Sequence, residues 1–187
     1  MLTFAFGGVN IAIVININKR VLLKGVTKMT HDKFAKWLKV VIIGVIIIGI
    51  TCCAYILPQM CGIFADKYPE MKSWILPWCI VIYICAIPCF VAMIVSWMIA
   101  SNIEKDNSFC MANAKLFKIF SMLALGDSIF LFVALMILWV LGFNHPGLML
   151  IELLIVFCGL AIFICTSALS YFVAKAASLQ EENDLTI

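Results

Sequence analysis

The segment FKIFSMLALGDSIFLFVALMILWVLGF, residues 117–143, decides the fold, because its only charged residues are Lys118 near its start and Asp127. A transmembrane helix needs about 20 consecutive apolar residues to cross a hydrocarbon core of about 30 Å. This segment exceeds that length. Because the backbone inside a bilayer must satisfy its own hydrogen bonds, the segment is predicted to be a membrane-spanning helix.

Three other apolar segments, residues 39–57, 74–100 and 148–174, place most of the chain in the same environment. Of the 187 residues, 65% are hydrophobic and only 12% are charged, and the mean hydropathy is +1.15. Soluble domains are usually about half apolar and about a quarter charged. The sequence therefore predicts an all-α membrane protein whose partner is the lipid bilayer. Its four transmembrane helices are expected to form two antiparallel hairpins within a domain over residues 39–178.

The basic residues predict how the chain is threaded through the membrane. Of the 13 lysine and arginine residues, only Lys67 and Lys72 lie between the first and second spans. The others lie before or at the start of the first span, around the loop between the second and third, or after the fourth. Cytoplasmic loops carry an excess of positive residues. We therefore expect a multi-pass protein of the cell membrane with both termini and the middle loop in the cytoplasm.

The N-terminal region divides into two parts. Residues 1–28 contain a short alternating segment, IAIVININ, followed by positive charges, which is the reverse of the order in a cleavable signal peptide. The tripeptide KGV before Met29 can be encoded by a purine-rich ribosome-binding sequence, so we interpret residues 1–28 as an untranslated leader or a disordered extension. Residues 29–38 place apolar side chains at helical spacing beside lysines, which predicts an interfacial amphipathic turn.

Prolines and glycines predict where the bundle bends and turns. Pro88 lies centrally in the second span, where its missing N–H kinks a helix, so it is either a hinge or a packing feature. Pro146 followed by Gly147 suits the two central positions of a type II turn between the third and fourth spans. Asn144 and His145 complete this corner, and His145 is expected to be a polar turn residue that faces the outside.

Asp127 is a carboxylic acid inside a span, and its depth decides how it is interpreted. Counted at about 1.5 Å per residue from the outer end of the span, it lies roughly 6 Å from the cytoplasmic edge of the hydrocarbon core. Thr166 and Ser167 of the fourth span are predicted at a similar depth, and Lys39 and Lys118 approach from the inner surface. Two interpretations stay open: a hydrogen-bonded structural acid that joins helices, or a gating, proton-linked or signalling group.

Glu152 is a second acid within the membrane, about 7.5 Å below the outer edge. It is level with Trp139, whose indole N–H is a candidate donor, and its side chain is also long enough to snorkel to the outer surface. Because Asp127 and Glu152 differ in depth by about 16 Å, they are not expected to form a catalytic pair.

The sequence contains no motif of catalysis or cofactor binding. The chain has 9 cysteines, but none forms a CxxC motif, and too few lie outside the spans for a disulfide framework. Cys85/Cys89 and Cys158/Cys165 each share a helix face, yet buried cysteine commonly behaves as a small apolar residue. HExxH, GxSxG and phosphate-loop motifs are absent from the sequence. We therefore expect no metal, no cofactor and no enzymatic activity.

Two polar segments on the predicted cytoplasmic side are candidates for contacting a partner. In the middle loop, SNIEKDNSFCMANAK, Ser108 is a suitable N-cap for the third helix. The fourth helix is expected to continue past the membrane into a polar tail, residues 179–187. This tail is either disordered or a docking peptide, whose candidate contact residues are Glu181, Glu182, Asn183, Asp184, Leu185 and Ile187.

Four motifs carry a resemblance: DNSFCMANAKLFKI, LALGDSIF, NHPG and LSYFVAKAASLQEENDLTI. Together they are similar to a bacterial family of small four-helix membrane proteins, domain-of-unknown-function family 2975, over most of the chain from Met29 onward. This sequence has Ala112 where the family's SFxxENA pattern expects Glu, so no role of that Glu is carried over. Genes of the family commonly lie beside a gene for a Cro/CI-type helix-turn-helix regulator. The resemblance therefore implies a cytosolic DNA-binding partner.

These observations favour a membrane-bound regulatory or sensory partner of a cytosolic helix-turn-helix regulator, with no nucleic acid bound directly by this chain. The alternative is an immunity or stress-protection protein against membrane-active peptides, or a small transporter. A homo-oligomer is compatible with either function.

Overall fold

The computed structural model describes residues 33–105 and 107–185, and all the regular structure in these ranges is helical. The predicted leader, residues 1–28, and Ile187 of the predicted docking peptide lie outside the described residues, as do residues 29–32 of the predicted interfacial turn; its residues 33–38 are helical. The elements in chain order are a helical segment over residues 33–51, η1 (Cys52–Ile56), α2 (Leu57–Lys67), η2 (Pro69–Met71), α3 (Lys72–Glu104), α4 (Met111–Val140) and α5 (Pro146–Leu185).

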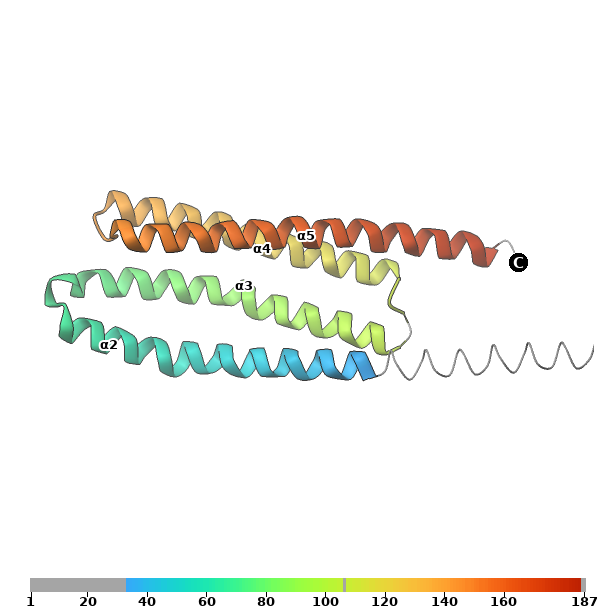
Figure 1. The fold of residues 1–187 in the computed structure, drawn as a ribbon, viewed down its shortest axis with the longest axis horizontal. Coiled ribbons are helices and arrows are strands. Elements are labelled where there is room, and N and C mark those ends of the chain that lie inside the picture. The colour runs from blue at the N-terminus through green and yellow to red at the C-terminus, as the bar shows by residue number, and fades with distance from the viewer. Residues whose placement is uncertain (1–32, 106, 186–187) are drawn as a thin grey trace, which may run out of the picture.

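Four helices are long and apolar enough to cross a membrane, which confirms the predicted all-α membrane fold. They cover Lys33–Lys67, Lys72–Glu104, Met111–Val140 and Pro146–Asn183. In Figure 1 they lie side by side along one long axis, with α3 running back along the first helix and α5 running back along α4. We call the end of the bundle at the α3–α4 connection the basic end. We call the opposite end, at the α2–α3 and α4–α5 connections, the distal end.

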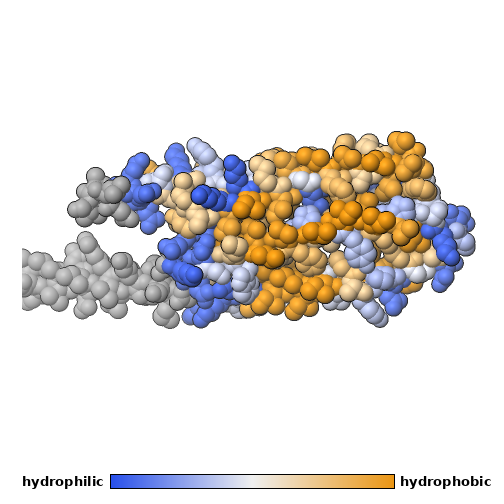
Figure 2. Space-filling model, turned by 180° about the vertical axis from the view of Figure 1, so that it is seen from behind, coloured by the Kyte–Doolittle hydropathy of each residue, from blue (hydrophilic) through white to orange (hydrophobic). Residues whose placement is uncertain are grey.

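Lipid is the environment that this surface fits. Figure 2 shows a broad apolar surface over the middle of the molecule, with hydrophilic residues gathered at its ends. Phe157 in the distal half of α5, for example, is 70% exposed. The buried core is correspondingly small: Val95 and Ile99 of α3 pack on Leu116 of α4. An apolar surface this continuous is a membrane-facing surface rather than a scatter of single exposed residues.

The first helix extends well beyond its predicted span of residues 39–57, because it continues through Pro58 to Lys67. Proline removes an N–H and its ring collides with the carbonyl group four residues earlier. Directly before Pro58 the chain forms one π-helical turn, η1, in which the N–H of Leu57 donates to the carbonyl of Cys52. The wider turn lets the helix pass the proline without ending, as single π-turns within α-helices do.

The connection between α4 and α5 differs from the predicted type II turn. Gly142 has a φ of 74°, its N–H donates to the carbonyl of Trp139, and the N–H of Phe143 donates to the carbonyl of Leu138. This pair of bonds is a Schellman motif, in which glycine ends the helix because it adopts positive φ without strain. The prediction was wrong because the left-handed residue is Gly142 rather than Gly147.

Pro146 and Gly147 are the first residues of α5 instead of turn residues. Proline suits the first helical position, where its missing N–H would have no partner within the helix. The ring nitrogen Nδ1 of His145 accepts the N–H of Gly147 at 3.1 Å, and the N–H of His145 donates to Asn144 Oδ1 at 2.8 Å. His145 therefore caps the start of α5.

At the basic end, Asn113 closes the connection between α3 and α4. Its side chain is fully buried. Its Nδ2 donates to the carbonyls of Asn107 and Ser108, at 3.1 Å and 3.0 Å, and its Oδ1 accepts from Nδ2 of Asn102 at 2.8 Å. The predicted cap at Ser108 is wrong, because α4 begins after Cys110 and has no side-chain cap. Ser108 contributes its carbonyl group instead.

Candidate functional site

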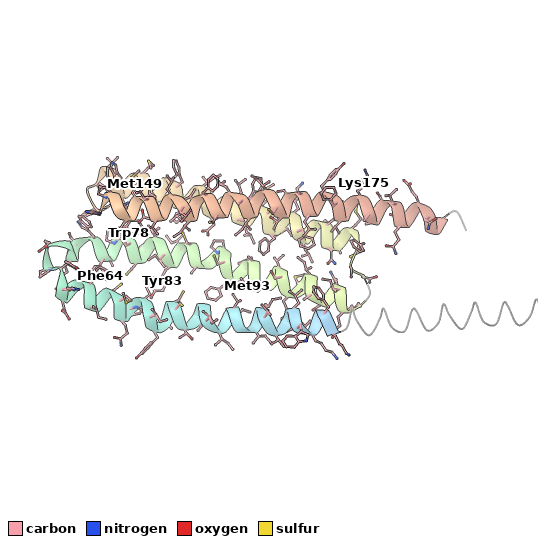
Figure 3. All side chains as sticks on the ribbon, viewed as in Figure 1. Phe64, Trp78, Tyr83, Met93, Met149 and Lys175 are labelled. Carbon is pink, nitrogen blue, oxygen red and sulfur yellow. The ribbon has the colours of Figure 1, made fainter. Side chains whose placement is uncertain are left out.

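A large cavity lies between the first helix and the other three, on the distal side of the bundle. Its volume is about 730 Å³, which falls within the usual range of about 300–1,000 Å³ for small-molecule sites. Phe64, Trp78 and Met93, labelled in Figure 3, lie along its walls, with Asp127 and Leu131 from α4 and Leu148, Glu152 and Ile155 from α5. The cavity therefore extends from the distal end toward the middle of the bundle.

The walls of this cavity are almost entirely apolar. Apart from the thiols and indole groups, its polar lining side chains are the two acids that the sequence singled out, Asp127 and Glu152. The sequence placed them at different depths, and the structure shows that both border the same space. Among the described residues no lysine or arginine lines it.

Asp127 faces α3, where it meets two cysteines one helical turn apart. Its Oδ2 lies 3.9 Å from the Sγ of Cys89, a weak thiol donor. Its Oδ1 is buried and accepts no hydrogen bond from any described residue. A buried polar atom is ordinarily hydrogen-bonded, so this oxygen marks the cavity wall as a candidate binding site.

None of the partners expected for Asp127 bonds to it among the described residues. Thr166 donates its hydroxyl to the carbonyl of Ile162 in its own helix, at 2.7 Å, and Ser167 does not bond to Asp127. Lys39 pairs with Glu104 at the basic end, where its ammonium group also lies 5.2 Å from the ring centroid of Trp97. Asp127 is thus left to the cavity rather than tied to α5 or to a lysine.

Glu152 is in a different position, because its carboxylate accepts a hydrogen bond from Nδ2 of Asn144 at 2.9 Å. The donor is therefore the residue before His145 rather than the predicted Trp139, which is 42% exposed on α4. This bond joins the start of α5 to the α4–α5 connection. Of the two acids, Glu152 has a hydrogen-bonding role in the fold and Asp127 has an unmatched oxygen.

Two further features were not anticipated from the sequence. The Sγ atoms of Cys61 in α2 and Cys79 in α3 lie 2.8 Å apart in the cavity wall. Trp78 donates its indole N–H to the carbonyl of Phe143 at 2.9 Å, which links α3 to the α4–α5 connection. Among the described residues, no three His, Cys, Asp or Glu side chains are grouped closely enough to hold a metal ion.

Two candidate features remain, the proline in the second span and the end of the chain. Helix α3 continues unbroken through Pro88, which lies between Cys85 and Cys89. At the other end of the molecule α5 continues to Leu185, so Asn183 and Asp184 of the proposed docking peptide are helical, and Glu181 and Glu182 are exposed.

Replacing Trp78 with phenylalanine is expected to lower the free energy of unfolding by about 1 kcal/mol, because the carbonyl of Phe143 loses its donor. Thermal unfolding in detergent micelles, followed by circular dichroism, measures this as a Tm lower by about 2–4 °C. Trp74→Phe is the matched control, since Trp74 lines the same cavity and its indole forms no hydrogen bond with a described residue. Equal Tm values for the two variants would show that the Trp78 bond does not hold the distal end together.

The fold and its apolar surface define a multi-pass helical membrane protein. The chain belongs to the family described as "Protein of unknown function (DUF2975)", whose profile matches residues 59–187. It is similar to the "Uncharacterized membrane protein YoaS" of Bacillus subtilis (strain 168), with 25% identity over 149 residues, covering 79% of this chain and 92% of the relative. The family resemblance seen in the sequence is therefore confirmed. No solved structure matches the chain significantly.

Proposed function

We propose that the protein is a regulatory subunit of the cell membrane that binds a cytosolic helix-turn-helix regulator through the end of α5. The observation that carries this proposal is the length of α5. It has 40 residues, whereas its neighbour α4 has 30. At 1.5 Å per residue these helices are about 60 Å and 45 Å long, and Figure 1 shows α5 projecting past the start of α4 at the basic end.

The chemistry of this projection suits a basic partner. Residues 178–183 are exposed, and the segment carries Glu181 and Glu182 beside the 58%-exposed side chain of Leu179. Proteins that bind DNA carry clusters of lysine and arginine. An acidic helix with an apolar neighbour is complementary to such a surface, and it would compete with DNA for it.

A cytosolic partner requires the basic end to face the cytoplasm. Support comes from Lys36, Lys39, Lys105, Lys115, Lys118 and Lys175, which belong to this end, whereas Lys67 and Lys72 belong to the distal end. Tags fused to both termini should therefore resist an impermeant reagent added to whole cells and react after lysis. Labelling in intact cells would overturn both the threading and the docking role of α5.

The binding step is tested by isolating the full-length protein from cross-linked cells and quantifying the neighbouring regulator that accompanies it. The double variant Glu181→Lys/Glu182→Lys should reduce recovery of the regulator at least tenfold, because it reverses the charge of the docking segment. Asp66→Lys/Glu70→Lys is the matched control, since it makes the same change of charge at exposed positions of the distal end. Failure to recover the regulator with the unaltered protein, or equal losses in both variants, would refute the proposal.

The cavity favours a second candidate, a small transporter or a protein that protects against membrane-active peptides. Such a function depends on the bundle and not on the end of α5. If the protein protects cells, a chain lacking residues 181–187 should protect them as well as the full-length protein does. If it is a regulatory subunit, the same deletion should abolish the regulatory output.

A further inference from the structure

We propose that the cavity is a binding site for a lipophilic amine, a molecule with one protonated amino group and a long apolar chain, and that Asp127 pairs with the amino group. Three properties carry the inference: the size of the cavity, the apolar character of its walls and the unmatched oxygen of Asp127. The proposal goes beyond the docking role of α5 and does not depend on it.

Size and lining restrict the ligand to a mainly apolar molecule. A volume of about 730 Å³ accommodates a ligand of ordinary small-molecule size. Trp78 lies near the distal end of this space and Cys89 lies beside Asp127. Along α3 these two positions are about 16 Å apart at 1.5 Å per residue. An extended alkyl chain is a suitable occupant of a space with these proportions.

The carboxyl group of Asp127 determines which charge the ligand should carry. A carboxylate only accepts hydrogen bonds, and burying one without a donor costs several kcal/mol. Oδ1 has no donor among the described residues, and the carboxyl group otherwise meets only weak thiol donors, those of Cys85 and Cys89. No cationic side chain in the described part of the chain lines the cavity, so a ligand that brings its own positive charge is the partner that would keep Asp127 ionised there. An ammonium group that still carries an N–H satisfies both the charge and the hydrogen bond.

Glu152 borders the same cavity but is a poorer candidate for the ammonium group. Asn144 already donates to it. The two acids therefore provide a control within one cavity. Removing the charge of Asp127 should weaken binding of the amine, whereas removing the charge of Glu152 should not. Bilayer lipid offers the rival occupant: its acyl chains would fill the same space by apolar contact alone, without any preference for charge.

The experiment uses the full-length protein in bilayer nanodiscs of zwitterionic phosphatidylcholine. The probe is a dodecylamine with a photoreactive diazirine at the chain end, and a dodecanol with the same diazirine is its uncharged counterpart. Labelled peptides are mapped by mass spectrometry. Each variant is compared with the unaltered protein in the same lipid, so that partition of the probe into the bilayer cancels.

We expect the amine probe to label the stretch of α3 around Trp74 and Trp78 and to be competed by unlabelled dodecylamine at concentrations at least tenfold lower than by dodecanol. Asp127→Asn should weaken amine labelling at least tenfold and leave the alcohol probe unchanged, whereas Glu152→Gln should change amine labelling less than twofold. Equal competition by amine and alcohol, or equal effects of the two substitutions, would overturn the proposal in favour of lipid chains.

A second variant keeps the test independent of how well Asp127→Asn folds. Gly49 of the first helix lines the cavity, and a Cβ atom there would lie 3.5 Å from the ring of Phe90, an ordinary contact distance. Gly49→Leu should therefore fill part of the space and reduce labelling by both probes. Undiminished labelling would show that the probes bind elsewhere. Because these measurements do not involve the neighbouring regulator, their failure is distinguishable from failure of the docking experiment.

Discussion

Substitution of Gly159 by alanine is expected to lower the free energy of unfolding by about 1–3 kcal/mol, the usual cost of adding a methyl group to a filled contact. A Cβ atom at this position of α5 would lie 2.2 Å from Oγ and 3.4 Å from Cβ of Ser128 in α4. The Ser128 hydroxyl has little freedom to move aside, because the residue is buried and donates to the carbonyl of Ala124 at 2.7 Å. Either this bond breaks or the two helices separate.

The controls for Gly159 make the cause testable by thermal unfolding in detergent. Gly126 of α4 has no atom within 4 Å of the corresponding Cβ position, so Gly126→Ala should leave Tm unchanged or raise it through better helix propensity. The double variant Gly159→Ala/Ser128→Ala should recover most of the lost stability, because the nearest remaining atom is then a Cβ at 3.4 Å. If Gly159→Ala proved as stable as Gly126→Ala, α4 and α5 would not be packed as closely as the structure shows.

Replacing Asn113 by alanine is expected to cost about 2–4 kcal/mol, since it removes a buried side chain together with three hydrogen bonds. The amide of Asn102 and two carbonyl groups of the α3–α4 connection then lose their partner. The connection should loosen, so trypsin should cut after the exposed Lys105 faster in the variant than in the unaltered protein.

Asn107→Ala is the matched control for Asn113, because Asn107 is exposed and takes part through its main-chain carbonyl, which alanine retains. Its Tm and its rate of cleavage at Lys105 should match those of the unaltered protein. Identical cleavage in Asn113→Ala would mean that the connection is ordered by something other than this buried amide.

The four spans were predictable from the sequence because long apolar segments have few alternatives to a membrane helix. The ends of these helices were less predictable, because hydropathy locates the part of a helix that lies in the hydrocarbon core and not the residue at which the helix ends. Lys33–Lys67 extends past its predicted limits on both sides. The signals for the α4–α5 connection were present as a glycine after an apolar run, Gly142, and a proline at a helix start, Pro146. Reading Pro146 and Gly147 as a turn of their own obscured them.

The surroundings of Asp127 show what a one-dimensional reading omits. Counting residues gives the depth of a side chain in the bilayer but not the direction in which it points around the helix axis. Depth favoured Thr166 and Ser167 in the adjacent helix, whereas Asp127 points to Cys85 and Cys89 of α3. Asn113 was overlooked for a related reason. An asparagine in a polar stretch suggests a solvent contact, and only the folded connection shows that it is buried.

The π-helical turn before Pro58 lets one continuous helix form the whole wall that the first helix contributes to the cavity. Ile46, Gly49 and Cys53 line the cavity on one side of the proline, and Leu57, Met60 and Phe64 continue this wall up to and beyond it. The intervals between these positions are three or four residues throughout, which is the spacing of a single helix face. A proline that ended the helix would have divided this wall, and the residues after it would form a separate segment at the mouth of the chamber.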